Sequence, residues 1–182
     1  MGEMDVGAAE VAAFWREAGP DRWFAQDDAF DAKFRDRFLD RHYAAARRQC
    51  DHWSDHAAGS LALMILLDQF PRNCFRGTGH MFATDPLARF FSRKAVAAGF
   101  DQAIEQDLRV FFYLPLEHSE LLADQQLSVE LHTARAEPYL KYARDHHAII
   151  ERFGRFPHRN PMLGRQTTPE ERAFLDGGGF AG

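Results

Sequence analysis

Residues 61–73 read LALMILLDQFPRN, and this stretch decides the fold. Its first part, Leu61 to Leu67, is apolar at every position, so a helix here has no face to offer to water. We therefore expect a helix over His56–Phe70 to be buried on all sides and to be the central element of the molecule. Proline fixes φ and has no N–H to donate, so Pro71 predicts that this helix ends at Phe70.

A second stretch, RFGRFPHRN at residues 152–160, resembles the end of the first one. In both, an apolar run leads to Phe-Pro, and Arg and Asn follow on what we expect to be a loop. Arginine offers a planar fork of donors and asparagine both donates and accepts, which suits a polar pocket for an anionic or amide group. We predict that the two loops meet, and that the pocket gathers these ligand-binding residues: Asp68, Arg72, Asn73, Arg76, Arg155, His158, Arg159, Asn160 and Arg165.

A structural interpretation of the same loops competes with the pocket. Where a helix ends, several carbonyl groups lack donors, and arginine and asparagine side chains can satisfy them. The arginines can also pair with Asp68, Asp85 or Glu117. The sequence leaves both interpretations open, and Arg72 and Arg159 are the two residues that we most expect to bind a ligand.

The rest of the chain predicts helices, because apolar residues recur at helical spacing and runs of strand-like alternation are absent. Besides the central helix we expect Val6–Glu17, Asp28–Arg48, a helix from Thr84 or Asp85 to Gly99, Asp101–Phe112 before an interruption at Pro115, Glu120–His132 with Ser119 as cap, Pro138–Gly154, and a short helix after the capping box Thr168–Glu171. The prediction is one all-α domain over residues 1–182. It has about seven or eight helices and a flexible glycine-rich tail at 177–182.

Composition excludes several classes of protein. The chain has 182 residues, with 22 Lys and Arg against 27 Asp and Glu, and a formal charge of -5. This balance argues against binding to nucleic acids or to anionic membranes, which need a basic face. Two cysteines and an acidic N-terminus predict no disulfide framework and no signal peptide. We expect a soluble, cytoplasmic protein whose oligomeric state the sequence leaves undetermined.

The peptide Glu117-His118-Ser119-Glu120 places an imidazole among carboxylates. This composition predicts general acid–base chemistry, with His118 as the acid or base and Glu117 or Glu120 orienting it. The alternative is a plain helix start, with Ser119 as cap and Glu120 near the positive end of the helix dipole. A metal site would have to gather histidines from distant parts of the chain, so we predict no metal, and the sequence identifies no cofactor.

Several of these motifs occur together in one known family. LDQFPRN with FRGT at 75–78, FATD at 82–85, YLPLEHSE at 113–120 and FGRFPHRN at 153–160 resemble the bacterial family DUF924, a domain of unknown function, over about residues 14–175. The resemblance implies an all-helical array with tetratricopeptide-like superhelical packing. It implies no agreed substrate or reaction, and the 34-residue tetratricopeptide signature itself is absent from the sequence.

Three functions fit these observations. We favour a helical binding module whose pocket captures an anionic small molecule or a peptide carboxylate. The second is an enzyme that acts on an anionic metabolite, with His118 as general acid or base and arginines holding the substrate. The third is a scaffold whose concave face binds a protein partner.

Overall fold

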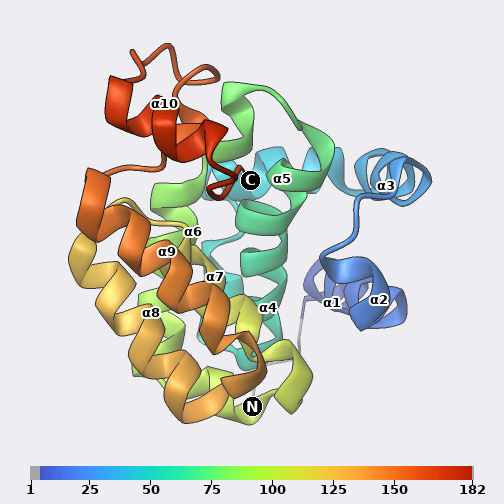
Figure 1. Cartoon of the computed structure of the whole chain (residues 1–182). Coiled ribbons are helices and arrows are strands. Elements are labelled where there is room, and N and C mark those ends of the chain that lie inside the picture. Colours follow the sequence, from blue (N-terminus) through green and yellow to red (C-terminus); the bar gives the residue numbers. More distant parts are fainter. Residues whose placement is uncertain (1–4, 182) are drawn as a thin grey trace.

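The computed structural model describes residues 5–181, and within them the chain is an all-α single domain without strands (Figure 1). The helices are α1 (Val6–Ala18), α2 (Pro20–Trp23), α3 (Asp28–Ala46), α4 (Ala57–Met64), α5 (Phe70–Cys74), α6 (Asp85–Ala97), α7 (Val110–Glu117), α8 (Leu122–Arg135), α9 (Leu140–Phe153) and α10 (Pro169–Asp176). Short 3-10 turns join them at Asp51–Asp55, Gly79–Phe82, Phe100–Ala103, Gln106–Leu108, Glu137–Tyr139 and Pro157–Arg159. The predicted fold class is confirmed at this level.

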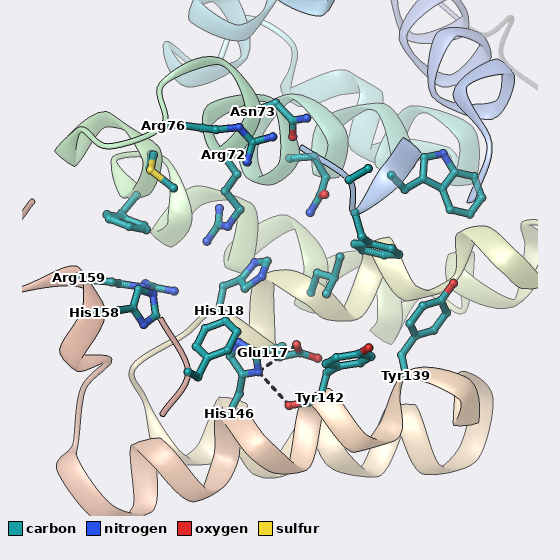
Figure 2. A pocket seen from close by; sticks show the side chains of 18 residues that line it. Arg72, Asn73, Arg76, Glu117, His118, Tyr139, Tyr142, His146, His158 and Arg159 are labelled. Atoms are coloured by element: carbon teal, nitrogen blue, oxygen red, sulfur yellow. Dashed lines mark hydrogen bonds and ion pairs between the residues drawn. The ribbon is translucent and has the colours of Figure 1, made fainter. Parts of the chain in front are cut away.

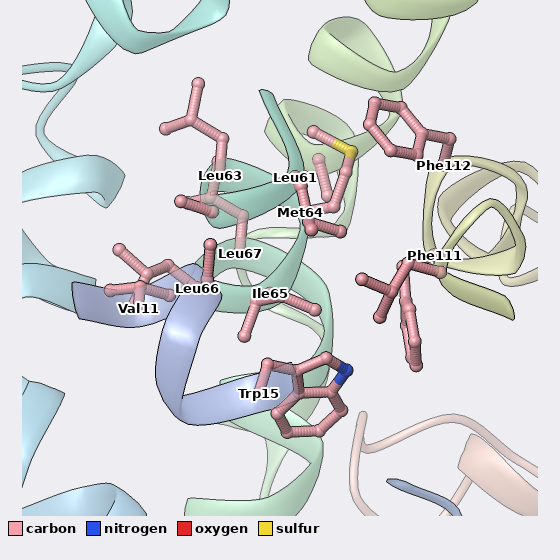
Figure 3. Packing of buried hydrophobic residues seen from close by; sticks show 14 of the residues in the cluster. Val11, Trp15, Leu61, Leu63, Met64, Ile65, Leu66, Leu67, Phe111 and Phe112 are labelled. Carbon is pink, nitrogen blue, oxygen red and sulfur yellow. The ribbon is translucent and has the colours of Figure 1, made fainter. Parts of the chain in front are cut away.

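The apolar stretch at 61–67 is the centre of the core, as predicted. Its side chains are fully buried, and α1 packs on one side of it while α6 and α7 pack on others. Figure 3 shows Val11 and Trp15 of α1 on one side of this helix, and Phe111 and Phe112 of α7 beside it. A helix without a polar face is thus enclosed by its neighbours, which removes its apolar surface from water.

The prediction that this helix ends at Phe70 is wrong. Residues Ile65–Gln69 form a π-helical turn that links α4 to α5, so the chain stays helical from Ala57 through Pro71 to Cys74. Proline is tolerated because side chains replace the donor that it lacks. The carbonyl of Leu66 contacts His42 Nδ1 at 2.9 Å, and that of Leu67 accepts from the Thr84 hydroxyl at 2.6 Å.

An aromatic cluster joins the N-terminal helices. Phe30, Phe34 and Phe38 lie on one face of α3, as their spacing predicts, and all three rings lie within 5.2 Å of the Phe14 ring of α1. The ring of Phe34 also lies 4.9 Å from that of Phe70, edge to face. This cluster connects the N-terminal helices to the central helix through aromatic packing.

Three predictions for residues 101–132 need correction: the cap at Asp101, the interruption at Pro115 and the helix start at Glu120. The predicted cap of that last helix is also wrong, because Leu121 and not Ser119 stands at its N-cap position. Asp101 caps no helix, because it is buried and accepts hydrogen bonds from Tyr113 Oη at 2.7 Å and Arg135 Nη1 at 2.6 Å. The helix α7 begins later, at Val110, and runs through Pro115 without interruption. All residues of α7 are buried, so packing compensates for the hydrogen bond that the proline removes. The next helix begins at Leu122, two residues after the predicted Glu120.

Two further predicted bounds are wrong: Pro138 lies in a 3-10 turn and α9 begins at Leu140, and α3 ends at Ala46 and not at Arg48. Three other helix ends follow the predicted signals. Pro86 stands in the first turn of α6, the left-handed Gly154 ends α9, and Thr168 and Glu171 form the reciprocal capping box of α10. Towards the C-terminus, α7, α8 and α9 pack in chain order, and α10 lies beyond the end of α9 (Figure 1). Over residues 5–181, none of the helices has the length and apolar character needed to cross a membrane.

Candidate functional site

A cavity of about 500 Å³ lies between α5, the end of α7, the start of α9 and the turn at Pro157–Arg159 (Figure 2). Its walls are Trp23, Phe24, Ala25, Gln69, Arg72, Asn73, Arg76, Met81, Phe82, Leu114, Glu117, His118, Tyr139, Tyr142, His146, His158, Arg159 and Phe180. Both Phe-Pro segments contribute to it. They therefore meet in space, as the sequence analysis expects, and they bring Arg72 and Arg159 to one cavity.

The two arginines share the carboxylate of Asp85, the first residue of α6. Arg72 donates from Nη1 to Asp85 Oδ1 at 2.9 Å and from Nη2 to Oδ2 at 3.1 Å. Its Nη1 also lies 2.8 Å from the carbonyl oxygen and 3.2 Å from Oδ1 of Asp68. Within residues 5–181, Arg159 donates one hydrogen bond, from Nη1 to Asp85 Oδ2 at 3.3 Å. Arg72 is therefore well paired, and Arg159 is not.

The position of Arg159 is unusual for a cation. Its guanidinium lies 4.6 Å from the ring of Phe82 and 4.4 Å from that of Phe156, and its Nε is buried without a hydrogen-bond partner in the described part of the chain. Burial, and next the positive charge of Arg72, lower the pKa of Arg159 to about 10. A buried donor without a partner costs free energy, which an acceptor on a bound molecule can recover.

His118, the residue that follows α7, forms a pair with Asp68. Its Nδ1 lies 2.8 Å from Asp68 Oδ1. Burial alone would raise the pKa of Asp68, but Arg72 and His118 together lower it to about 2, so this carboxylate is ionised and can only accept. The Nδ1 atom of His118 therefore carries the proton, and its Nε2 is left as a free acceptor at the cavity. Burial, and next Arg72, lower the pKa of His118 despite this pairing.

Glu117 is a second buried acid in the same wall. Burial, and next the charges of Asp68 and Asp145, raise the pKa of Glu117 to about 8, so it is largely protonated at neutral pH. Its Oε1 lies 3.3 Å from Nδ1 of His146, and that nitrogen donates to the carbonyl of Tyr142 at 2.8 Å (Figure 2). A neutral carboxyl group and a neutral imidazole thus lie beside one cavity, which is an arrangement suited to proton transfer.

Asp68 is therefore the residue that orients the ring of His118. Neither Glu117 nor Glu120 orients it, contrary to the prediction. Glu120 points elsewhere: its carboxylate accepts two hydrogen bonds from Arg165, at 2.8 and 2.9 Å, and one from the Phe156 backbone at 2.8 Å. Glu117 and His118 line the larger cavity, whereas Glu120 does not. All of these residues were predicted from the sequence to belong to a site, but Asp68 was expected to bind the ligand and not to orient His118.

Besides Asp68, Arg72 and Arg159, which are described above, the predicted ligand-binding residues form three groups. Asn73 and Arg76 line the cavity, but both also bind Asp31, from Nδ2 of Asn73 at 2.7 Å and from Nε of Arg76 at 3.0 Å. His158 lines the cavity beside Arg159, and burial, followed by that arginine, lowers its pKa to about 3. It is therefore a neutral ring.

The third group lies outside the larger cavity. Arg155 forms two hydrogen bonds to Glu171, at 2.6 and 2.9 Å, and buried Asn160 donates to the same carboxylate at 3.1 Å. Arg165 is paired with Glu120. These contacts attach the loop after α9 to α10 and to the segment between α7 and α8, which is the structural role that the alternative interpretation describes.

A smaller cavity of about 230 Å³ adjoins the larger one. The two share Phe82, His118 and Arg159, and the smaller one is lined in addition by Asp85, Pro86, Arg89, Pro115, Ser119, Glu120 and Leu163. His118 and Arg159 therefore stand between two hollows, so a molecule bound in either can reach them.

Comparison with known proteins now places this geometry in a family. The family model described as a bacterial protein of unknown function, DUF924, matches residues 11–179. The chain belongs to the DUF924 family. A solved structure of a protein of unknown function from Agrobacterium tumefaciens is 59% identical, with a TM-score of 0.91. The alignment covers 93% of this chain and 97% of that one. No curated protein matches.

The aromatic part of the cavity in this DUF924 chain is absent from the predicted site residues. Trp23, Phe24, Tyr139, Tyr142 and Phe180 all line the cavity. Two features of the sequence could have indicated them. Tyr139 and Tyr142 are three residues apart at a helix start, and Phe180 stands alone in a glycine-rich tail. That tail reaches the site, because the Phe180 ring lies 4.5 Å from the ring of His146.

Two further chemistries can be assessed for the described residues of this DUF924 protein. His118, His146 and His158 line one cavity, but residues 5–181 contain no group of three or more His, Cys, Asp or Glu placed to hold a metal ion. Both cysteines are free thiols. Burial, and next the charge of Asp31, raise the pKa of Cys74 to about 12, so it is not a nucleophile at neutral pH.

Proposed function

We propose that this protein binds a small molecule through an anionic group, a carboxylate or a phosphate, that pairs with Arg159 in the larger cavity. The observation that carries the proposal is the incomplete pairing of this buried guanidinium. It has one long hydrogen bond, to a carboxylate that Arg72 already occupies, and a buried Nε without a partner. An oxyanion can accept two parallel hydrogen bonds from such a fork.

The charges around Arg159 support an anion. Arg72 and Arg159 face Asp68 and Asp85, so the fixed charges balance, while Glu117 and the histidines of the cavity are largely neutral at neutral pH. Burial is the largest cause of the lowered pKa values of His146 and His158, and the charge of Arg159 lowers both further. An anion at this site would pair with Arg159, because Arg72 already pairs with its two carboxylates.

Binding of phenylacetate and phenyl phosphate, measured by calorimetry and by thermal shift, tests this proposal. Both compounds should raise the melting temperature through mass action, and their neutral amide and alcohol analogues should bind at least tenfold more weakly. Arg159→Gln should abolish the difference between anion and neutral analogue, and Arg159→Lys should retain part of it. Arg152→Gln removes the same charge from an exposed position near the end of α9, outside both cavities, and serves as the control. Equal binding of charged and neutral compounds would refute the proposal.

A second function, acid–base catalysis on the bound anion, is favoured by the pair of Asp68 and His118. The free Nε2 of His118 can accept a proton from the bound molecule, while Asp68 holds the ring and stabilises its charged form. Protonated Glu117 can donate a proton in the same cavity. One residue as base and its neighbour as acid would give proton transfer without a metal or a covalent intermediate.

Substitution of His118 separates catalysis from binding. For any compound that binds, nuclear magnetic resonance of the compound over hours reveals turnover. His118→Gln should abolish product formation and leave the dissociation constant within about threefold, because Arg159 still holds the anion. Turnover that persists in this variant would eliminate His118 from the mechanism.

The scaffold function and the tetratricopeptide-like superhelix stay predictions. If neither the anionic compounds nor their neutral analogues bind, while peptides do, the scaffold function would be favoured over a small-molecule pocket.

A further inference from the structure

The larger cavity has two chemically different ends. Arg159 and His158 lie at one side, with His118 and Arg72 near them, and Tyr139 lies at the opposite side with Tyr142 between (Figure 2). The ring of Tyr139 is 5.6 Å from that of Phe24. Cation and neutral rings at one end thus face a group of aromatic side chains at the other.

The aromatic end is more exposed than a packing role requires. Phe24 is 53% exposed and Tyr142 is 56% exposed, although both line the cavity. Phe24 stacks on the buried Phe111 at 5.9 Å, so one face of its ring is fixed against the core while about half of the side chain stays open. Large apolar side chains that gather at a hollow in this way are typical of a surface that binds an apolar group.

The cavity is much larger than a simple oxyanion. At about 500 Å³ it has the volume of sites that hold molecules of roughly drug size, whereas one water takes up about 30 Å³ of liquid. Among the arginines of the described walls, Arg76 binds Asp31 with a side chain 36% exposed, whereas Arg159 is buried and keeps an Nε without a partner. A bound anionic group is therefore most strongly favoured at Arg159, and the rest of the cavity has room for a much larger part of the ligand that carries no charge.

Building on the proposed function, we infer that the ligand class is an aromatic monoanion, with its carboxylate or phosphate on Arg159 and its ring against Phe24 and Tyr139. Aromatic side chains bind aromatic ligands through offset and edge-to-face contacts, which an alkyl chain cannot make in the same way. The linker between the anionic group and the ring of the ligand must span the distance between the two ends of the cavity. The cavity should therefore select the length of the ligand as well as its ring and its charge.

A length series tests this inference. Benzoate, phenylacetate, phenylpropionate and phenylbutyrate should bind with increasing affinity, roughly fourfold per methylene group until the ring reaches the aromatic end. Straight-chain carboxylates with the same number of carbon atoms should bind at least fivefold more weakly than the best aryl acid. An affinity that is flat along the series, or equal for the alkyl acids, would overturn the inference.

Matched variants locate the ring. Phe24→Ser should lower the affinity for the best aryl acid at least fivefold and leave acetate and inorganic phosphate unchanged. Phe90→Ser is the control, because Phe90 is 52% exposed and lines neither cavity. Since both side chains are half exposed, both variants should fold. Equal effects of the two substitutions would also overturn the inference.

The two proposals fail in different ways. If acetate and phosphate bind in a manner that depends on Arg159 but the aryl series gives no gain, the anion site stands and the aromatic class is wrong. If aryl compounds bind equally well as acids and as amides, and Arg159→Gln has no effect, the proposed anion site is wrong and the aromatic end alone binds.

Discussion

The two Phe-Pro segments have nearly the same sequence and different structures. In the first, the helix continues through Pro71, and Arg72 lies on α5 with three hydrogen bonds from its guanidinium to Asp68 and Asp85. In the second, α9 ends at Gly154, a 3-10 turn begins at Pro157, and Arg159 lies in that turn with one long hydrogen bond. The comparison teaches that the same residue types can give a well-paired arginine in one segment and an incompletely paired one in the other, and we propose that the second binds the ligand.

The largest effect that distinguishes the segments is on stability. Arg72→Met should lower the free energy of unfolding by about 3–5 kcal/mol, because it leaves buried Asp68 and partly buried Asp85 without their main partner. Arg159→Met should lower it by less than about 1 kcal/mol, since methionine fills the space between the rings and one weak hydrogen bond is lost.

Urea unfolding of both variants at neutral pH provides the measurement. Methionine keeps most of the arginine volume at both positions, so the contrast reports pairing and not packing. Similar losses in the two variants would show that Arg159 is as fully engaged as Arg72, and this would remove the basis of the anion site.

The sequence predicts that Arg72 and Arg159 lie at one pocket, but it cannot predict that one is well paired and the other is not. Asp85 was among the possible partners, but whether it meets Arg72, Arg159 or both depends on how α6 packs against segments far away in the chain. The same holds for Asp68 and His118, which are 50 residues apart and meet because α7 packs beside the central helix. The capping box of Thr168 and Glu171 depends only on neighbouring residues, and the sequence predicted it correctly. The caps predicted at Asp101 and Ser119 are wrong.

Packing also explains where local signals failed. Pro71 and Pro115 are strong signals for the end of a helix, yet both lie within helices. In each case burial or a side chain from another element replaces what the proline removes, as Thr84 does for the carbonyl of Leu67. Such compensation comes from residues that a local pattern does not include.

The next largest effect is the dependence of stability on pH, which comes from a buried acid. The pKa of Asp68 is lowered to about 2, whereas that of Glu117 in the cavity wall is raised to about 8. A raised carboxyl pKa means that stability is fully present below the pKa of the unfolded chain and is lost as pH rises through the folded value. Between about pH 5.5 and pH 7.5, Glu117 is ionised in the unfolded chain but still largely protonated in the folded protein. The unfolding free energy should therefore fall by about 2–3 kcal/mol over this range.

The variant Glu117→Gln isolates this contribution. Its unfolding free energy, measured across this pH range, should lack that loss, so the difference from the parent protein grows with pH. Histidines with lowered pKa values titrate in both proteins and cancel in the difference. A difference that does not change with pH would mean that Glu117 is ionised at neutral pH and is no general acid.

The smallest effect tests why only one of the two segments ends its helix. Gly154 has φ of 67°, a left-handed conformation that costs other residues about 1 kcal/mol, and a Cβ added there would meet no atom within 4 Å. Gly154→Ala should therefore lower the unfolding free energy by about 1 kcal/mol through the backbone alone. Pro157→Ala, three residues later at a buried position, should leave the end of α9 at Phe153, because the helix has already ended there. Hydrogen exchange of the backbone amides after Gly154 measures this, and new helical protection there in Pro157→Ala would mean that the proline ends the helix, so that the continuous helix through Pro71 would need another explanation.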